Sequence, residues 1–225
     1  AAAILDDLAW LGLHWDGAVR VQSAHLPEYR GTLDALSARG LLYPCFCTRA
    51  DIAREIAASA SAPHGPDGPL YPGTCRRLSA DERASRLAAG EAHALRLDMA
   101  AALATLAAPL TFEEHGSRLA CDPARFGDAV LARKDVPASY HLCVTHDDAL
   151  QGVTLVTRGM DLKPATDLHR LLQSLMGWPE PCYAHHALLT DASGRRLAKR
   201  DRAATIRDLR AAGASAAEVL RRAGA

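Results

Sequence analysis

The run QGVTLVTRGMDL, residues 151–162, has the clearest structural pattern in the chain. Val153, Leu155 and Thr157 alternate with side chains of the opposite face in a β-branched run, which predicts a strand. Gly159 ends this strand. A helix is predicted from residue 161 to Gly177, with apolar side chains at helical spacing: Leu168, Leu171, Leu172 and Leu175. The order of strand, glycine and helix indicates an α/β fold.

Arg158 stands at the end of the predicted strand. In open α/β sheets, ligands bind at the carboxyl ends of strands, where helix amides favour anions. A guanidinium at that place offers a fork of donors to a carboxylate or a phosphate. A nucleotide or carboxylate site near Gly159 is one interpretation. A surface arginine in an ordinary β-α unit is the other, and the local pattern leaves both open.

Further strands are predicted around this run, at residues 127–133, 140–144 and 183–189. Asp147 and Asp148 are interpreted as a turn before the strand rather than as a general base. Beyond a turn at residues 191–194 come four cations, Arg195, Arg196, Lys199 and Arg200. A mobile loop that grips polyphosphate has this composition, and so does a solvated basic turn.

Toward the N-terminus the chain alternates helices with short strands. Two helices are predicted before Gly40, and the first lacks a capping residue, so we expect the sequence to start inside an element. Capping-box patterns at Thr48, Ser79 and Ser215 predict further helices. Short strands are expected at residues 92–98 and 110–114, and a flexible loop at residues 59–73. The middle region is interpreted as an insert in the sheet domain.

Cys45, Cys47 and Cys75 can supply three thiolates to one zinc ion. A tetrahedral structural site needs a fourth ligand, and ligand chemistry alone favours His64 first and His93 second. The alternative is three reduced cysteines without a metal. Such a zinc ion would organise the surrounding loop rather than take part in chemistry.

The composition excludes several classes of protein. The 225 residues suffice for a sizeable core, and Lys plus Arg equal Asp plus Glu at 26 each, so an RNA partner would need a local basic patch. No secretory signal or membrane-spanning run is present in the sequence, and the six cysteines are irregularly spread. We therefore expect a soluble cytoplasmic protein.

Several segments, taken together in their order and spacing, resemble the glutamyl-type class I aminoacyl-tRNA synthetases. They are LGLHWDG, the CFC pair, YPGTCR, GDAVLARKD, SYHLCVTHDDALQGVTLVTRGMDL and RRLAKRD, and they extend from about Ile4 to about Ala211. Within this family the chain is most similar to the short paralogues that act on queuosine in tRNA(Asp). The resemblance implies a Rossmann-like catalytic domain with a zinc-containing insert. Residues 1–44 and 127–225 would belong to the catalytic domain and residues 45–126 to the insert.

The resemblance also implies an activity, in which glutamate is activated with ATP and transferred to the queuosine base in the anticodon of tRNA(Asp). Tyr140 and Arg158 match the glutamate-binding positions of the family, and Gly159 and Asp161 match positions close to the adenosine. Lys199 matches the phosphate-binding lysine of the KMSKS-type loop, although Ala198 stands where serine is usual. No side chain is assigned as a catalytic nucleophile or base. The protein is expected to be a monomer.

For the metal, the family pattern of Cys-x-Cys followed by Tyr-x-x-x-Cys implies Tyr71 as the fourth ligand, with Cys45, Cys47 and Cys75. The loop between Cys47 and Tyr71 is longer than expected for the family, so His64 stays open.

The sequence departs from the family in lacking the HIGH-type signature, which we expect to lie upstream of residue 1. Two alternative functions stay open at this point. One is a trimmed glutamyl-tRNA synthetase that charges the 3′ end of tRNA(Glu). The other is a non-catalytic, zinc-stabilised RNA-binding relative.

Overall fold

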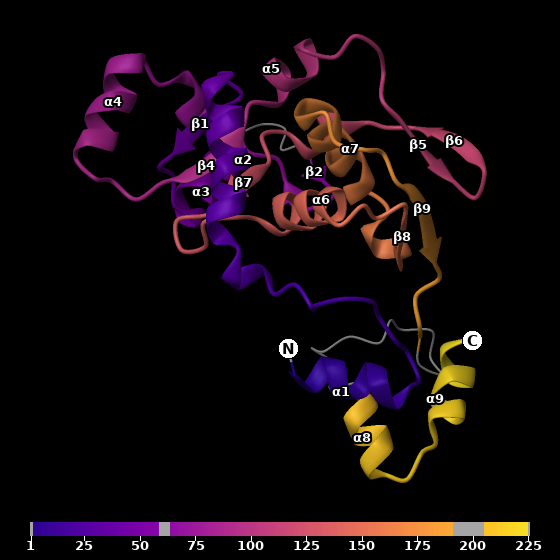
Figure 1. The fold of residues 1–225 in the computed structure, drawn as a ribbon. Coiled ribbons are helices and arrows are strands. Elements are labelled where there is room, and N and C mark those ends of the chain that lie inside the picture. The colour runs from indigo at the N-terminus through magenta and orange to yellow at the C-terminus, as the bar shows by residue number, and fades with distance from the viewer. Residues whose placement is uncertain (1, 59–63, 191–204, 225) are drawn as a thin grey trace. The chain divides into compact units, whose positions relative to one another are not determined.

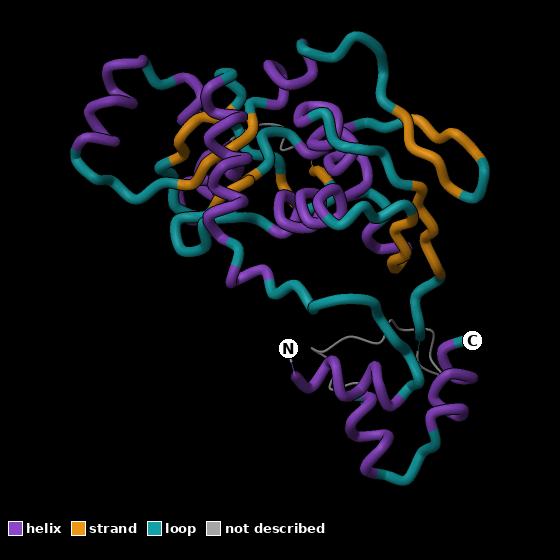
Figure 2. Tube along the Cα trace, in the orientation of Figure 1, coloured by secondary structure: helices purple, strands orange, loops and turns teal. Residues whose placement is uncertain are grey.

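The computed structural model describes residues 2–58, 64–190 and 205–224. The described chain divides into two compact units, one of residues 25–186 and one of residues 1–24 with 187–225. Lys199 and the other cations of the predicted basic loop lie outside the described residues. Helices and strands alternate along the chain, as an α/β protein requires (Figure 1, Figure 2).

The larger unit contains both the predicted strand at Arg158 and the three clustered cysteines. Its helices are α2 (Leu26–Ala38), α3 (Arg49–Ala58), α4 (Ala80–Ala88), α5 (Met99–Ala104), α6 (Tyr140–Leu150) and α7 (Ala165–Met176), with 3₁₀ turns η2 (Thr74–Arg77), η3 (Pro123–Phe126) and η4 (Met160–Leu162). Its strands are β1 (Leu42–Cys45), β2 (His64–Gly65), β3 (Gly68–Pro69), β4 (Ala94–Leu97), β5 (Thr111–Glu114), β6 (Ser117–Ala120), β7 (Val130–Ala132), β8 (Leu155–Gly159) and β9 (Cys182–His186).

A four-stranded sheet carries the predicted ligand-binding strand. Its order is β6-β5-β9-β8, with β9 parallel to both β5 and β8 and with β5 antiparallel to β6. Arg158 lies opposite His185 in the register of β8 and β9. The strand predicted within this run is therefore confirmed as β8, which begins at Leu155 rather than Val153 and ends at Gly159 as expected.

Helix α7 connects the parallel strands β8 and β9. Its apolar side chains Leu168, Leu171 and Leu172 are fully buried, as the helical spacing predicted. The helix ends where Gly177 adopts a left-handed backbone with φ of 66°, which glycine tolerates without steric cost. This β-α-β unit places the residues after Gly159 at the start of a buried helix.

The strand predicted at residues 140–144 is wrong, because these residues begin helix α6. The Ser139 side chain caps this helix by accepting a hydrogen bond from the Leu142 backbone N–H. Asp147 and Asp148 lie within the helix instead of forming a turn. A short apolar run fits either structure by pattern alone, and the cap together with burial of one helical face favours the helix here.

A second, antiparallel sheet has the order β1-β4-β7, and β2 and β3 form a two-residue hairpin. The strands predicted at residues 92–98, 110–114, 127–133 and 183–189 are present as β4, β5, β7 and β9. The main core lies between this sheet and helices α2, α5, α6 and α7, and it includes Leu33, Leu97, Leu131, Leu142 and Leu171. Asp147 is part of this packing, since it accepts hydrogen bonds from the buried Tyr29 hydroxyl at 2.8 and 3.0 Å.

The smaller unit contains α1 (Ala2–Trp10), η1 (Gln22–Ala24), α8 (Ile206–Ala211) and α9 (Ala216–Ala223). Within it, the Arg210 guanidinium lies over the Trp10 ring at 5.6 Å from the ring centre. Ser215 and Glu218 form the predicted capping box of α9. In the described part of the chain, no helix combines the length and the apolar character that crossing a bilayer requires.

Candidate amino-acid and metal sites

Arg158 lies at the centre of a hydrogen-bonded cluster on strand β8. Its Nε donates to His185 Nε2 at 3.1 Å, its Nη1 to His169 Nδ1 at 3.0 Å, and its Nη2 to Thr166 Oγ1 at 2.5 Å. The same guanidinium lies 5.3 Å from the centre of the Tyr183 ring. Each nitrogen of the side chain therefore has one partner among the described residues, which holds the planar group in one orientation.

These contacts with described residues use only some of the N–H groups of Arg158. A guanidinium has five N–H groups, of which the cluster uses one on each nitrogen. The two that remain are one on Nη1 and one on Nη2, and a bidentate contact with a carboxylate needs one N–H on each of two nitrogens. The geometry thus suits Arg158 to a carboxylate ligand, as one of the two interpretations of the sequence proposed.

Glu114 supports the cluster from strand β5. Its buried carboxylate accepts hydrogen bonds from Lys163 Nζ and His185 Nδ1, both at 2.5 Å. Burial alone would raise the pKa of Glu114, but the hydrogen bonds from Lys163 and His185 outweigh it and lower the pKa to about 2. Burial also lowers the pKa of His185. At neutral pH the pair is therefore an ionised carboxylate beside a neutral imidazole.

Tyr140 lies at the N-terminus of α6, and its side chain is 47% exposed. Its ring is 5.5 Å from the centre of His141 and 6.1 Å from that of His169. Because His169 also accepts from Arg158, the two predicted glutamate-binding residues both lie near one buried imidazole. The structure brings Tyr140 and Arg158 to the same region, although they come from different elements.

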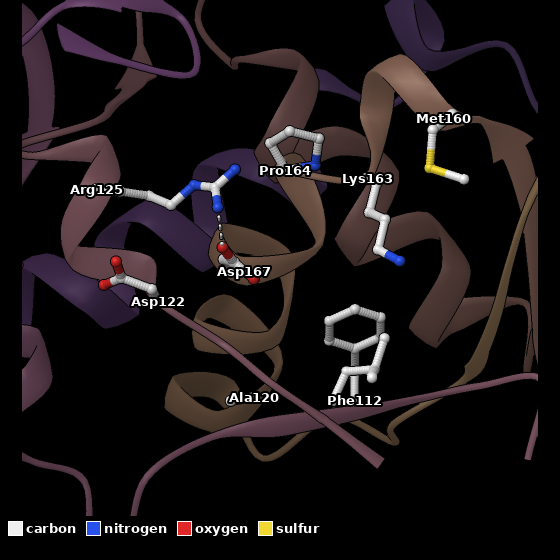
Figure 3. A pocket seen from close by; sticks show the side chains of 9 residues that line it. Phe112, Ala120, Asp122, Arg125, Met160, Lys163, Pro164 and Asp167 are labelled. Carbon is white, nitrogen blue, oxygen red and sulfur yellow. Dashed lines mark ion pairs between the residues drawn. The ribbon is translucent and has the colours of Figure 1, made fainter. Parts of the chain in front are cut away.

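Gly159 is the last residue of β8, and Asp161 lies in the exposed η4 turn that follows it. A pocket of about 380 Å³ lies nearby, between the start of α7 and strands β5 and β6. Figure 3 shows the Lys163 side chain extending toward the Phe112 ring, and Arg125 paired with Asp167 at 3.4 Å. The predicted adenosine-binding positions thus lie at the carboxyl end of a strand beside an open, charged pocket.

The three clustered cysteines converge as the sequence predicted. Cys45 ends β1, Cys47 follows it, and Cys75 lies in η2, with all three Sγ atoms within 4.8 Å of one another. Cys47 Sγ is 3.4 Å from Cys75 Sγ and 3.3 Å from the Tyr71 hydroxyl oxygen. A zinc–sulfur bond of about 2.3 Å places two tetrahedral ligands about 3.8 Å apart, so this donor set fits one such ion.

Tyr71 is held in place at the cluster. Its hydroxyl oxygen accepts a hydrogen bond from the Cys75 backbone N–H at 2.8 Å, and the Arg96 guanidinium lies over its ring at 3.9 Å. Among the described histidines, cysteines and acidic residues, only the three cysteines form a group with this spacing, so neither His64 nor His93 joins them. The structure therefore offers Tyr71 as the nearby fourth donor.

The electrostatics of the cluster differ between its members. Burial raises the pKa of Cys47 to about 11. Burial acts in the same direction on Cys75, but hydrogen bonds with Tyr71 and the Phe46 backbone N–H outweigh it and lower the pKa of that thiol. A cation must displace thiol protons when it binds, so its affinity rises with pH.

Sequence reasoning missed most of the residues around Arg158. Glu114, His169 and His185 were not singled out, because none of them belongs to a recognised pattern. One signal was available: Thr166 and His169 are three residues apart in a predicted helix, so both side chains point to the same face. Their contact with β8 depends on how α7 packs, and periodicity does not reveal that.

Comparisons with known proteins place this geometry in a family. The family model of tRNA synthetases class I (E and Q), catalytic domain, matches residues 1–223. A glutamyl-Q tRNA(Asp) synthetase from Rhodobacter capsulatus is 48% identical over 98% of this chain and 80% of its own length. One from Nocardia farcinica is 44% identical over 96% of this chain and 65% of its own length.

A solved structure agrees with the fold. A glutamate-tRNA synthetase from Elizabethkingia anophelis superimposes with a TM-score of 0.70 at 23% sequence identity, covering 89% of this chain and 42% of that one. This chain therefore spans about two thirds to four fifths of the two relatives described above, and less than half of the solved chain. From the family match, the identities and the shared fold, the chain belongs to the class I tRNA synthetases, within the group of glutamyl-Q tRNA(Asp) synthetases.

Proposed function

We propose that the protein activates L-glutamate with ATP and transfers it to the queuosine base in the anticodon of tRNA(Asp). The observation that carries this proposal is the Arg158 guanidinium, held by three partners and keeping on each terminal nitrogen one N–H that none of the described residues engages. The names of the relatives supply the substrate class. They favour this activity over charging of tRNA(Glu) and over a non-catalytic RNA-binding role.

In this proposal the protein positions two anions and needs no nucleophile of its own. A glutamate carboxylate attacks the α-phosphate of ATP, which forms the acyl adenylate and releases pyrophosphate, so the protein must hold both groups and stabilise charge that develops on the phosphates. Arg158 pairs with a glutamate carboxylate, and the hydroxyl of the exposed residue Tyr140 donates a hydrogen bond to the same substrate. Gly159 and Asp161 lie against the adenosine, and Lys199 contacts the phosphates.

A zinc ion is assigned a structural role. Cys45, Cys47, Cys75 and Tyr71 would hold it, and it would fix the loop between β1 and η2. We also propose that residues 45–126 form an insert of the catalytic domain. The free cysteines of the chain suit the reducing cytoplasm, which we propose as the location of a monomeric protein.

The acceptor is tested by transfer of labelled glutamate. Protein expressed from its complete native reading frame is incubated with ATP and with tRNA(Asp) that carries or lacks queuosine. We expect labelling of the queuosine-containing tRNA only, because the modified base supplies the acceptor. Equal labelling of both tRNAs, or better labelling of tRNA(Glu), would contradict the proposal.

A further inference from the structure

Arg158 is connected to a distant loop by a chain of side chains. His169 Nε2 lies 3.1 Å from His141 Nδ1, and His141 Nε2 lies 3.2 Å from a carboxylate oxygen of Asp67. Together with the contact between Arg158 and His169, this series runs from β8 through α7 and α6 to the turn between β2 and β3. None of His169, His141 and Asp67 lines the pocket beside strands β5 and β6.

The direction of every hydrogen bond in the series follows from its first member. Arginine only donates, so His169 Nδ1 must accept from it. A neutral imidazole with an acceptor at Nδ1 carries its proton at Nε2, so His169 donates to His141 Nδ1. By the same argument His141 carries its proton at Nε2 and donates to Asp67. One arginine thus sets both tautomers.

The surroundings of His169 keep its imidazole neutral. His169 is 2% exposed, and burial, followed by the positive charge of Arg158, holds its pKa well below the usual range. A second proton on His169 would sit at Nδ1, directly opposite the N–H of Arg158. The neutral imidazole is therefore the form that supports the guanidinium.

The far end of the series lies in the loop that carries the metal cluster. Asp67 stands in the β2–β3 turn, four positions before Tyr71, whose hydroxyl contacts Cys47. Its side chain is 68% exposed, so it contributes little to packing and serves as an accessible anchor for His141. The series consequently joins the loop of the metal site to the arginine of the amino-acid site.

We propose that His169 and His141 are positioning residues that orient the Arg158 guanidinium for the amino acid, with Asp67 as their anchor. This inference rests on the proposed function, because it assumes that Arg158 binds glutamate. His169 accepts a hydrogen bond from Nη1, the nitrogen whose second N–H would bind the substrate. Loss of the His169 imidazole would therefore let the Arg158 guanidinium rotate. The expected consequence is weaker glutamate binding with intact ATP binding.

The test is glutamate-dependent pyrophosphate exchange by the protein in its complete native reading frame. We expect His169→Leu to raise the glutamate KM about tenfold, the effect of losing one hydrogen bond to a charged group, while the ATP KM stays unchanged. His169→Gln should restore the glutamate KM, because its carbonyl accepts from Arg158 and its amide donates to His141. His141→Phe keeps the ring but breaks the series, and Asp67→Ala removes the exposed anchor; both should raise the glutamate KM about threefold.

Two further variants separate failure of the inference from failure of the proposed function. His146→Phe makes the same change on α6 at a histidine that packs against Tyr29 and Trp178, and it should leave the glutamate KM unchanged. If Arg158→Ala raises the glutamate KM but the variants at His169, His141 and Asp67 do not, the positioning role is overturned. If Arg158→Ala has no effect, the glutamate site itself is wrong, and the positioning role falls with it. Because Asp67 is exposed, its variant remains informative even where a buried substitution prevents folding.

Discussion

The metal cluster and the Arg158 cluster are built in different ways. The cysteines and Tyr71 all come from one short segment of the chain, residues 45–75. The Arg158 cluster combines side chains from β5, β8, β9 and α7, which lie between Glu114 and His185. The first site depends on one local segment and the second on the packing of a whole β-α-β unit. Substitutions in the metal cluster should therefore change zinc content, whereas substitutions in the Arg158 cluster should change the free energy of unfolding.

The largest expected effect is on the metal cluster. We expect protein purified without added metal to contain about one zinc ion per chain, and Cys47→Ala to contain almost none, because a structural site needs its full set of donors. Tyr71→Phe should retain zinc more weakly, whereas His64→Ala should retain it fully. Elemental analysis of the purified proteins measures this directly.

The matched control is Cys121→Ala, which removes a thiol outside the cluster. It should keep the zinc content of the unaltered protein. Equal zinc in Cys47→Ala and Cys121→Ala would rule out the site, and loss of zinc in His64→Ala would replace Tyr71 by His64 as the fourth ligand.

A smaller effect is expected at the base of the Arg158 cluster. Glu114 has a folded pKa of about 2, below its ordinary value of 4.5, so its stabilising effect is complete above about pH 4.5 and is lost as the pH falls toward 2. Glu114→Gln should therefore lower the free energy of unfolding at pH 7 by about 1–3 kcal/mol, the usual cost of losing charged hydrogen bonds in a buried site. The difference from the unaltered protein should shrink in acid.

Urea denaturation at pH 7, 4 and 3 measures this prediction. Glu113→Gln alters the adjacent carboxylate, which points to the other face of β5 and does not contact Lys163 or His185 in the described structure. It should change the free energy of unfolding less than Glu114→Gln at pH 7. If the free energies of unfolding of Glu114→Gln and the unaltered protein differed by the same amount at all three pH values, Lys163 and His185 would not lower the pKa of Glu114.

The difference between the two sites also explains what the sequence could predict. The alternation at Val153, Leu155 and Thr157 and the helical spacing up to Gly177 identified the β-α unit correctly, because both are local periodicities. The cysteine cluster could also be predicted from the local sequence, because its three cysteines lie close together along the chain and few residue types bind zinc. Capping boxes at Ser79 and Ser215 likewise marked helices that the structure contains.

The interpretations that failed depend on packing. The segment beginning at Tyr140 reads as a strand by composition, and only the Ser139 cap and the buried face of α6 settle it as a helix. The partners of Arg158 escaped prediction because His185, which contacts Arg158, and Glu114, which contacts His185, come together only after three strands align. Hydrogen-bond networks across elements have no periodicity along the chain, so a single sequence does not reveal them.

The most direct test of the proposed activity asks where glutamate is attached. Queuosine-containing tRNA(Asp) is offered to the protein, in its complete native reading frame, before and after removal of its 3′-terminal nucleotides. Because the proposed acceptor is a base of the anticodon, labelling with glutamate should persist after trimming, with a bond that forms independently of the 3′ end. Loss of labelling after trimming would contradict the account, since it would place glutamate on the 3′ end, as in a synthetase that charges tRNA.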